Sequence, residues 1–202
     1  DGSDGRGRLA VALNTGAKLD AETVLYATGR RPNTRGLGLE NARVQTGMNG
    51  EIVVGPDSRS SIESIYAVGD VTNRANLTPV AIREGHAFAD TVFGNRPWTA
   101  DHELIPTAVF SEPEVATVGL AEHAAREWHG EIDIYKARFR PMKYTLSGRE
   151  ERMLMKLVVE AKSQRIVGCH VLGPDAAEIV QMAAIAMRMG ATKADFDRTM
   201  AL

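Results

Sequence analysis

The segment Ser64–Gly85, SIYAVGDVTNRANLTPVAIREG, constrains the fold of this chain more than any other stretch. The branched and aromatic residues of Ile65–Val68 predict a short buried strand, which Gly69–Asp70 ends with a turn. Pro79 then occupies a natural first position of a helix, and Val80–Phe93 is compatible with helix. The segment therefore predicts a strand, a carboxylate in a turn and a helix start in quick succession.

A carboxylate at a strand end and a nearby helix start suit the polyol arm of a flavin nucleotide. Asp70 could accept hydrogen bonds from polyol hydroxyl groups. The first N–H groups of the helix, at its positive dipole end, favour negative charge such as that at the pyrimidine edge of a reduced isoalloxazine. An ordinary strand, loop and helix crossover explains the same spacing equally well, so the residues alone leave both interpretations open.

Composition limits the classes of function. With 202 residues, of which 44% are hydrophobic, the chain can form one large domain or two small ones. A net charge of -2 and no long basic run argue against a nucleic-acid partner. No apolar stretch approaches the roughly 20 residues that cross a bilayer, and no signal peptide precedes the first strand. The sequence thus predicts a cytoplasmic protein without a membrane partner.

Cys169 is the single cysteine, so the chain cannot form an intrachain disulfide, a dithiol or a multi-cysteine metal site. Its neighbour His170 belongs to the same predicted strand, where successive side chains point to opposite faces. We therefore expect Cys169 to be a buried, inert thiol. The other histidines show no regular ligand spacing, so no metal site is predicted from His102, His123 and His129.

The first part of the chain looks like the end of one domain and the start of another. Apolar runs at Leu9–Leu13 and Thr23–Ala27, separated by turn residues, predict a hairpin and a strand. Gly29–Gly38, rich in glycine and arginine, fits an exposed crossing between domains. Asn49–Gly50 predicts a short hairpin that leads into the flavin-like segment.

The last hundred residues have a different pattern. Pro97 and the polar run Thr99–Glu103 break the helix pattern and predict a boundary near His102. Beyond it, strands with helices set apart indicate an α+β domain with a largely antiparallel sheet. The predicted strands are Thr107–Phe110, Ala116–Gly119, Ile132–Phe139, Met153–Val159 and Ile166–Leu172, and the predicted helices are Ala121–His129 and Ala176–Met189.

The helix Ala176–Met189 carries small and flexible apolar residues at helical spacing, namely Ile179, Met182, Ala183 and Ala186. This face could pack on the domain's own sheet, or its alanines could let a second helix approach closely. The pattern leaves both possibilities open.

Three quoted stretches resemble the pyridine nucleotide-disulfide oxidoreductases. IYAVGDV with LTPVAIREG resembles their second FAD-binding stretch, ATGRRPNT at 27–34 the exit from their nicotinamide domain, and IPTAVFSEPEVATVGL at 105–120 the opening of their dimerisation domain. The resemblance implies the α/β tail of a flavoprotein with two dinucleotide-binding domains, followed by an α+β dimerisation domain. It places the NAD(P) domain's end at 1–34, an FAD segment at 35–101 and a truncated dimerisation domain at 102–202.

Two further stretches are similar to the branch of this family that reduces glutathione disulfide: residues 139–159 and residues 173–197. That branch implies FAD as cofactor, NADPH as co-substrate, glutathione disulfide as substrate and a homodimer formed through the C-terminal domain. Dihydrolipoyl dehydrogenase, mercuric reductase and trypanothione reductase remain alternative branches. The alternative that is not an enzyme is a dimerisation scaffold without a redox role.

The resemblance also implies roles for individual residues. Asp70 would bind the ribityl chain or pyrophosphate of FAD, and the backbone at Thr78 would face a flavin carbonyl oxygen. His86 stands where some members use an arginine to hold the substrate, so it implies a weak contact or a surface histidine. The full set is Gly69, Asp70, Leu77 and Thr78 for FAD, Gly29 for NADP and His86 for substrate.

The family's catalytic groups are not among these residues. Its members pass electrons from NADPH through FAD to a CxxxxC pair, and use a histidine of an HPT motif as acid and base. This sequence contains neither motif and no GxGxxG loop. We therefore expect the chain to be a C-terminal portion of the enzyme that is inactive alone and binds FAD weakly.

Overall fold

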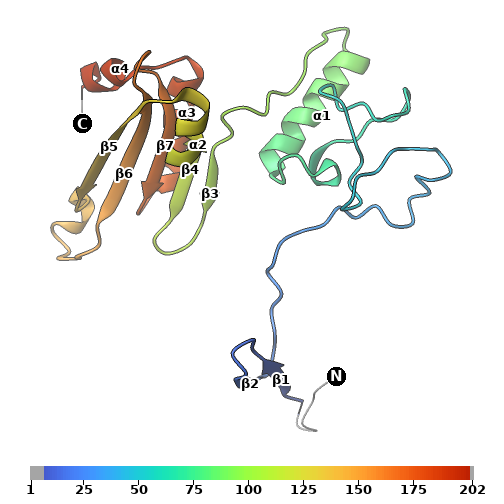
Figure 1. Ribbon diagram of the computed structural model, residues 1–202, viewed down its shortest axis with the longest axis horizontal. Helices are drawn as coiled ribbons and strands as arrows, with labels where there is room; N and C mark the ends of the chain where they lie inside the picture. Colours follow the sequence, from blue (N-terminus) through green and yellow to red (C-terminus); the bar gives the residue numbers. More distant parts are fainter. Residues whose placement is uncertain (1–6, 201–202) are drawn as a thin grey trace. The chain divides into compact units, whose positions relative to one another are not determined.

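The structure of the chain is a computed structural model that describes residues 7–200. The chain divides into two compact units, with the division between Ala100 and Asp101. Figure 1 shows that the first unit has few regular elements, whereas the second is built around a sheet with helices packed on it.

The first unit begins with an antiparallel hairpin of β1 (Leu9–Ala12) and β2 (Lys18–Ala21). The hairpin was expected, but the strand predicted at Thr23–Ala27 is wrong, because these residues form no strand. Their side chains are open to solvent, with Leu25 86% and Tyr26 85% exposed. Among residues 7–200, β1 and β2 pair only with each other, and the apolar run pairs with neither.

A small apolar cluster organises the middle of the first unit. Val44, Ile52 and Ala67 are buried in it. The turn predicted around Asn49–Gly50 is confirmed, since the backbone on its two sides pairs at the bridge from Thr46 to Ile52.

The buried strand predicted at Ile65–Val68 is wrong. Only Tyr66 forms a β-bridge, to Arg59. The Ala67 N–H donates to the carbonyl of Ser58 at 3.0 Å, a typical length for such a bond. Because the segment pairs with one short stretch rather than with full strands, it is extended backbone without a ladder.

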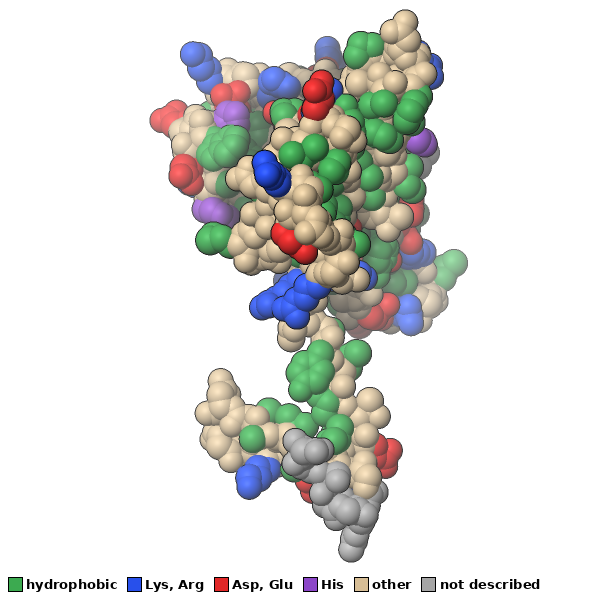
Figure 2. Space-filling model, turned by 90° about the vertical axis from the view of Figure 1, so that its right-hand side faces the viewer, with side chains coloured by type: hydrophobic (Ala, Val, Ile, Leu, Met, Phe, Trp, Pro, Cys, Tyr) green, Lys and Arg blue, Asp and Glu red, His purple; other side chains and the backbone are tan. Residues whose placement is uncertain are grey.

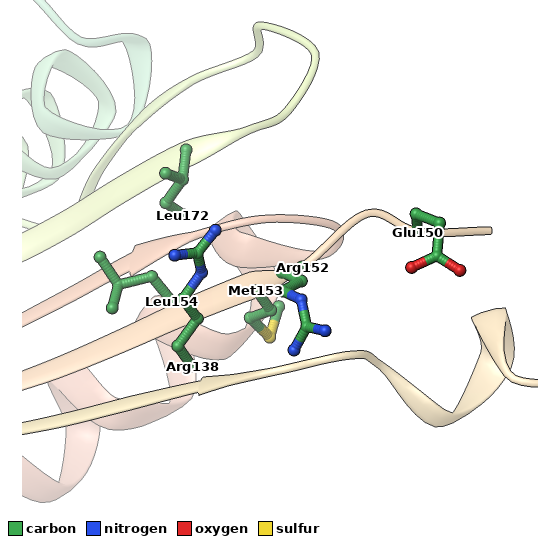
Figure 3. Close-up of a pocket in the computed structure, with 6 residues that line it drawn as sticks. All are labelled: Arg138, Glu150, Arg152, Met153, Leu154 and Leu172. Atoms are coloured by element: carbon green, nitrogen blue, oxygen red, sulfur yellow. The ribbon is translucent and has the colours of Figure 1, made fainter.

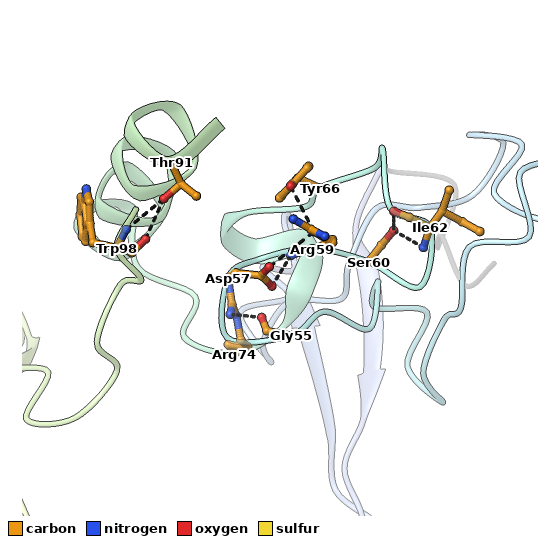
Figure 4. A network of polar contacts seen from close by, with 9 residues as sticks. All are labelled: Gly55, Asp57, Arg59, Ser60, Ile62, Tyr66, Arg74, Thr91 and Trp98. Carbon is orange, nitrogen blue, oxygen red and sulfur yellow. Dashed lines mark hydrogen bonds and ion pairs between the residues drawn. The ribbon is translucent and has the colours of Figure 1, made fainter. Parts of the chain in front are cut away.

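The helix expected after the segment is confirmed as α1 (Thr78–Val92), with Pro79 in its first turn. A 3₁₀ helix, η1 (Gly69–Thr72), precedes it. Beyond α1 the chain folds back on the helix: the Trp98 indole N–H donates to Asp90 Oδ2 (3.0 Å). The Trp98 backbone N–H donates to the Thr91 hydroxyl at 3.1 Å, a contact that Figure 4 draws.

The second unit contains a five-stranded sheet in the order β3-β4-β7-β6-β5, and every neighbouring pair is antiparallel. This confirms the predicted α+β fold with an antiparallel sheet. The strands lie within about a residue of their predicted bounds: β3 (Thr107–Val109), β4 (Val115–Gly119), β5 (Ile132–Phe139), β6 (Met153–Glu160) and β7 (Ile166–Leu172).

Four helices accompany this sheet: η2 (Met142–Tyr144), α2 (Glu122–His129), α3 (Ala176–Arg188) and α4 (Lys193–Arg198). Figure 1 shows α3 lying along β4 and β7, and these elements share the main core. The core contains, from the strands, Ala116, Val118, Met153, Val159, Ile166, Cys169 and Val171, and from α3, Ala176, Val180, Ala184 and Met187.

The stripe of α3 that is buried against the sheet is not the face that the alanine pattern marks, for which packing on the sheet was one of two open possibilities. Met182 of the predicted face is 67% exposed, whereas Val180 and Met187 are almost fully buried. Ile179 and Ala183 pack only at the edge of the core. The helix uses one apolar stripe against its own sheet and leaves a second one, including Ile185 (51% exposed), at the surface.

Apolar side chains are also visible among charged ones on the face drawn in Figure 2. Within residues 7–200, no helix is long and apolar enough to cross a membrane.

Candidate functional site

Gly69 joins the extended segment to η1 and lies directly against α1. Its φ is +71°, and an added Cβ would lie 2.8 Å from the Cβ of Ala81, in the first turns of the helix. A positive φ disfavours L side chains, and so close a contact excludes them further. Only glycine lets the chain turn this tightly beside the helix, and Asp70 follows immediately.

A buried carboxylate fastens this turn to the helix. The Gly69 N–H donates to Glu84 Oε2 at 2.6 Å. Glu84 belongs to α1 and is 1% exposed. A charge this deeply buried is stable only when it is paired and hydrogen-bonded.

Arg74 supplies the positive charge that pairs with the Glu84 carboxylate, since its Nη2 lies 2.8 Å from Glu84 Oε1. The same guanidinium donates to Ser58 Oγ at 2.8 Å and to the carbonyl of Gly55 at 3.3 Å, the contact shown in Figure 4. Its Nε donates to Thr72 Oγ1 at 3.3 Å. Loop 55–58, η1 and α1 are thus joined by one polar network.

Asp70 lies in the first turn of η1 and is exposed. Within the described part of the chain, no side-chain hydrogen bond or ion pair is made to its carboxylate. An exposed carboxylate on a rigid turn is well placed to accept hydrogen bonds from hydroxyl groups of a ligand. The predicted carboxylate is therefore present and accessible.

The N-terminus of α1 is the second half of the site. Leu77, half-buried and extended (φ −129°, ψ 131°), caps the helix without a side-chain hydrogen bond. Thr78 is exposed, and Pro79 carries no N–H, so the first turn presents few donors of its own. Because Gly69 packs on the first turns of α1, the structure brings Gly69, Asp70 and the helix start together.

The other two predicted site residues, Gly29 and His86, are not part of the network formed by Glu84 and Arg74. Gly29 has φ +116° and open space around its missing Cβ, which suits a backbone that a ligand approaches closely. His86 is exposed on α1. It lies near Asp90, whose carboxyl pKa is lowered chiefly by the hydrogen bond from Trp98 and to a lesser extent by charges that include His86.

The structure agrees with an inert Cys169. Burial raises the pKa of its thiol to about 11, so the reactive thiolate is absent near neutral pH. The adjacent His170 bonds Thr117 Oγ1 and the carbonyl of Leu120. Burial lowers the pKa of its imidazole. Among residues 7–200, no group of three His, Cys, Asp or Glu side chains could hold a metal ion.

A surface cavity of about 460 Å³ lies in the second unit, at one end of β5, β6 and β7. Its lining includes Arg138, Arg152 and Leu154, which Figure 3 labels. None of the predicted site residues lines it.

Sequence reasoning missed Glu84 and Arg74. The signal was available in the helix itself: Val80, Glu84 and Ala87 fall on one stripe of α1, and a carboxylate in an otherwise apolar stripe indicates a buried, paired charge.

The chain has the fold of a flavoprotein disulfide reductase. It is similar to the HOCl-induced flavoprotein disulfide reductase RclA from Escherichia coli, with a TM-score of 0.86 and 25% sequence identity over 98% of this chain and 45% of that one. Two family models, both named for pyridine nucleotide-disulphide oxidoreductases, match it: one at residues 1–85, and the dimerisation domain at 105–202. The chain belongs to this family.

Three curated relatives within this family are glutathione reductases. The chain is 55% identical over 195 residues to the glutathione reductase of Burkholderia cepacia, covering 96% of this chain and 43% of the relative. It is 48% identical over 196 residues to the chloroplastic/mitochondrial glutathione reductase of Pisum sativum, covering 97% and 36%. The glutathione reductase of Nostoc is 51% identical over 195 residues, covering 90% and 42%. The chain therefore spans less than half the length of these relatives.

Proposed function

We propose that this chain supplies the second flavin-binding segment and the dimerisation unit of an FAD-dependent, NADPH-linked enzyme that reduces glutathione disulfide to two molecules of glutathione. The observation that carries the proposal is Asp70 on a rigid turn against the first turns of α1, in a chain whose relatives are glutathione reductases.

The chemistry of these residues supports a role in binding FAD. Asp70 offers an exposed carboxylate to the hydroxyl groups of the polyol arm. The helix start, which no side chain caps, offers the backbone N–H of Thr78 and a positive dipole end to a flavin carbonyl oxygen. Gly69 keeps the two close together. Bound FAD would supply electron transfer between a pyridine nucleotide and a disulfide.

Other assignments follow from the family resemblance. Residues 1–34 would close the NAD(P) domain, with Gly29 beside the NADPH site, 35–101 would belong to the FAD domain, and 102–202 would form the dimerisation domain. His86 would contact the disulfide substrate weakly. With a single cysteine, this chain holds no dithiol, so the reducing pair would come from elsewhere in the enzyme. One buried thiol and no disulfide also suit a cytoplasmic location.

The partner would be a second copy of the chain, bound through the second unit. The surface stripe of α3 supports this, because Met182, Ile185 and Met189 are 67%, 51% and 84% exposed. Apolar side chains gathered on one helix face are typical of an interface.

Binding of the cofactor can be tested on the ¹⁵N-labelled chain by titration with FAD, because amide shifts register weak binding. We expect shifts at Gly69, Asp70 and Val80. Asp70→Asn should weaken binding about tenfold, as expected for loss of a charge-assisted hydrogen bond, whereas the exposed Glu63→Gln should leave it unchanged. Binding without shifts in this segment, or no binding to millimolar FAD, would contradict the flavin role.

Activity can be tested by replacing the matching 195 residues of the Burkholderia cepacia relative with those of this chain. We expect the replacement enzyme to be a yellow dimer that oxidises NADPH with glutathione disulfide, and the isolated chain to be inactive. Preference for trypanothione disulfide, for the lipoamide couple or for Hg²⁺ would assign another branch of the family. A colourless dimer without activity would favour a scaffold role.

A further inference from the structure

We infer that Glu84, paired with Arg74, is a positioning residue of the flavin site, which sets the direction in which Asp70 presents its carboxylate. The inference rests on the proposed function, because it assigns to Glu84 an effect on the flavin through Asp70. Glu84 itself would make no contact with the ligand.

The first observation is that both oxygens of Glu84 are occupied on the protein side. Oε2 accepts the Gly69 N–H at 2.6 Å, and Oε1 lies 2.8 Å from Arg74 Nη2. Gly69 is the residue immediately before Asp70. One carboxylate on α1 therefore holds the Val68–Gly69 peptide, one residue before Asp70.

The second observation is that the far side of η1 is held by the same pair. Arg74 Nε donates to Thr72 Oγ1 at 3.3 Å, and the Thr72 hydroxyl donates to the Gly69 carbonyl at 2.8 Å. Asp70 lies between Gly69 and Thr72, both buried, while its own side chain is exposed. Its backbone is thus held on both sides, and only its carboxylate is left to the solvent.

The third observation concerns the free-energy cost of burying the ion pair of Glu84 and Arg74. Burying an ion pair adds little net stability, since desolvation offsets the attraction, and an apolar pair of similar size often serves as well. Glu84, however, also accepts a hydrogen bond from the Gly69 amide, next to Asp70, and an apolar residue could not accept it. The other acid of α1, Asp90, also pairs with an arginine, Arg96, but it is half-buried and lies at the far end of the helix from Gly69, so it is a control.

A double-mutant cycle separates positioning from simple stabilisation. Glu84→Gln, Asp70→Asn and the double variant of the full chain are titrated with FAD by amide shifts, with affinities taken from initial slopes, and are melted in parallel. We expect losses in FAD affinity of about fivefold for Glu84→Gln and tenfold for Asp70→Asn, and about tenfold, rather than fiftyfold, for both, because coupled residues are not additive. Their effects on the melting temperature should add, and Asp90→Asn should not change affinity.

Four outcomes decide between these possibilities. Additive losses in affinity, or a Glu84→Gln variant that melts earlier but binds FAD as before, would overturn the positioning role and leave the flavin site intact. An unchanged affinity in Asp70→Asn would overturn the proposed function itself. If Glu84→Gln does not fold, Glu84→Gln with Arg74→Gln removes both charges together and takes its place in the cycle. In the unsubstituted chain the Gly69 amide must exchange slowly, and fast exchange would overturn the inference without any variant.

Discussion

Each of the two units of this chain is stabilised internally by a different kind of interaction. The second unit has five strands in one antiparallel ladder and a continuous apolar core shared with α3. The first unit has three buried residues in its apolar cluster, and its flavin-like segment is held by Glu84, Arg74 and the backbone of Gly69. The comparison teaches that the scaffold is built by burial of apolar surface, whereas the candidate site is built by a polar network that can set directions.

The largest expected effect comes from removing Glu84. Glu84→Ala leaves Arg74 without its buried partner and Gly69 without its acceptor, so the first unit should lose about 3 kcal/mol. Amide exchange should accelerate around Gly69 and α1 and stay unchanged in the sheet of the second unit. Glu63→Ala, an exposed glutamate of the same unit, is the control. Equal acceleration in both units would show that the units do not differ as described.

A substitution in the apolar core tests the second unit. Met187→Ala removes a side chain that is 1% exposed in the main core, and should cost about 2–5 kcal/mol in unfolding free energy because a cavity remains. Met182→Ala, on the same helix but 67% exposed, should cost a few tenths. Chemical denaturation followed at the sheet measures both. A larger loss for Met182 would mean that the surface stripe of α3 is already covered in solution.

A third prediction sharpens the account of the turn. Gly69→Ala forces an L residue to φ +71° beside Ala81, and should cost about 2 kcal/mol. Gly85→Ala lies within α1 with open space around it, and should stabilise the helix by about 0.5–1 kcal/mol. Thermal unfolding compares the two. The same sign for both substitutions would refute the geometric role of Gly69.

The smallest effect concerns pH and the end of the second unit. Asp195 accepts hydrogen bonds from the side chain and backbone of Thr192, and also from Arg198, which together lower its pKa to about 2. A lowered pKa in the folded state stabilises α4 above about pH 4, and this contribution is lost as the pH falls toward 2. Amide exchange at Thr192, measured relative to the intrinsic exchange rate at each pH, should therefore quicken over that range. In Asp195→Asn it should be fast throughout, and a variant that kept the pH dependence would exclude Asp195 as its source.

Much of the second unit could be predicted, because its strands are long enough for their alternation to be read and its turns carry glycine and proline. The first unit could be predicted less well. The apolar run Thr23–Ala27 has the composition of a strand but lacks a partner, and Ile65–Val68 forms only one bridge. Strand formation depends on a neighbour that local sequence does not reveal.

The sequence by itself determined where α1 begins, because Pro79 acts locally, and it determined that a turn at Gly69–Asp70 follows the extended segment. It also determined the strands of the antiparallel sheet, through residue types that favour extended backbone. Only the tertiary structure decided that Glu84 is buried against Gly69, that Arg74 completes the pair, and that α3 packs through Val180 and Met187 rather than through Met182. Propensity and turn chemistry act over a few residues, whereas burial and charge pairing depend on which distant segments come together.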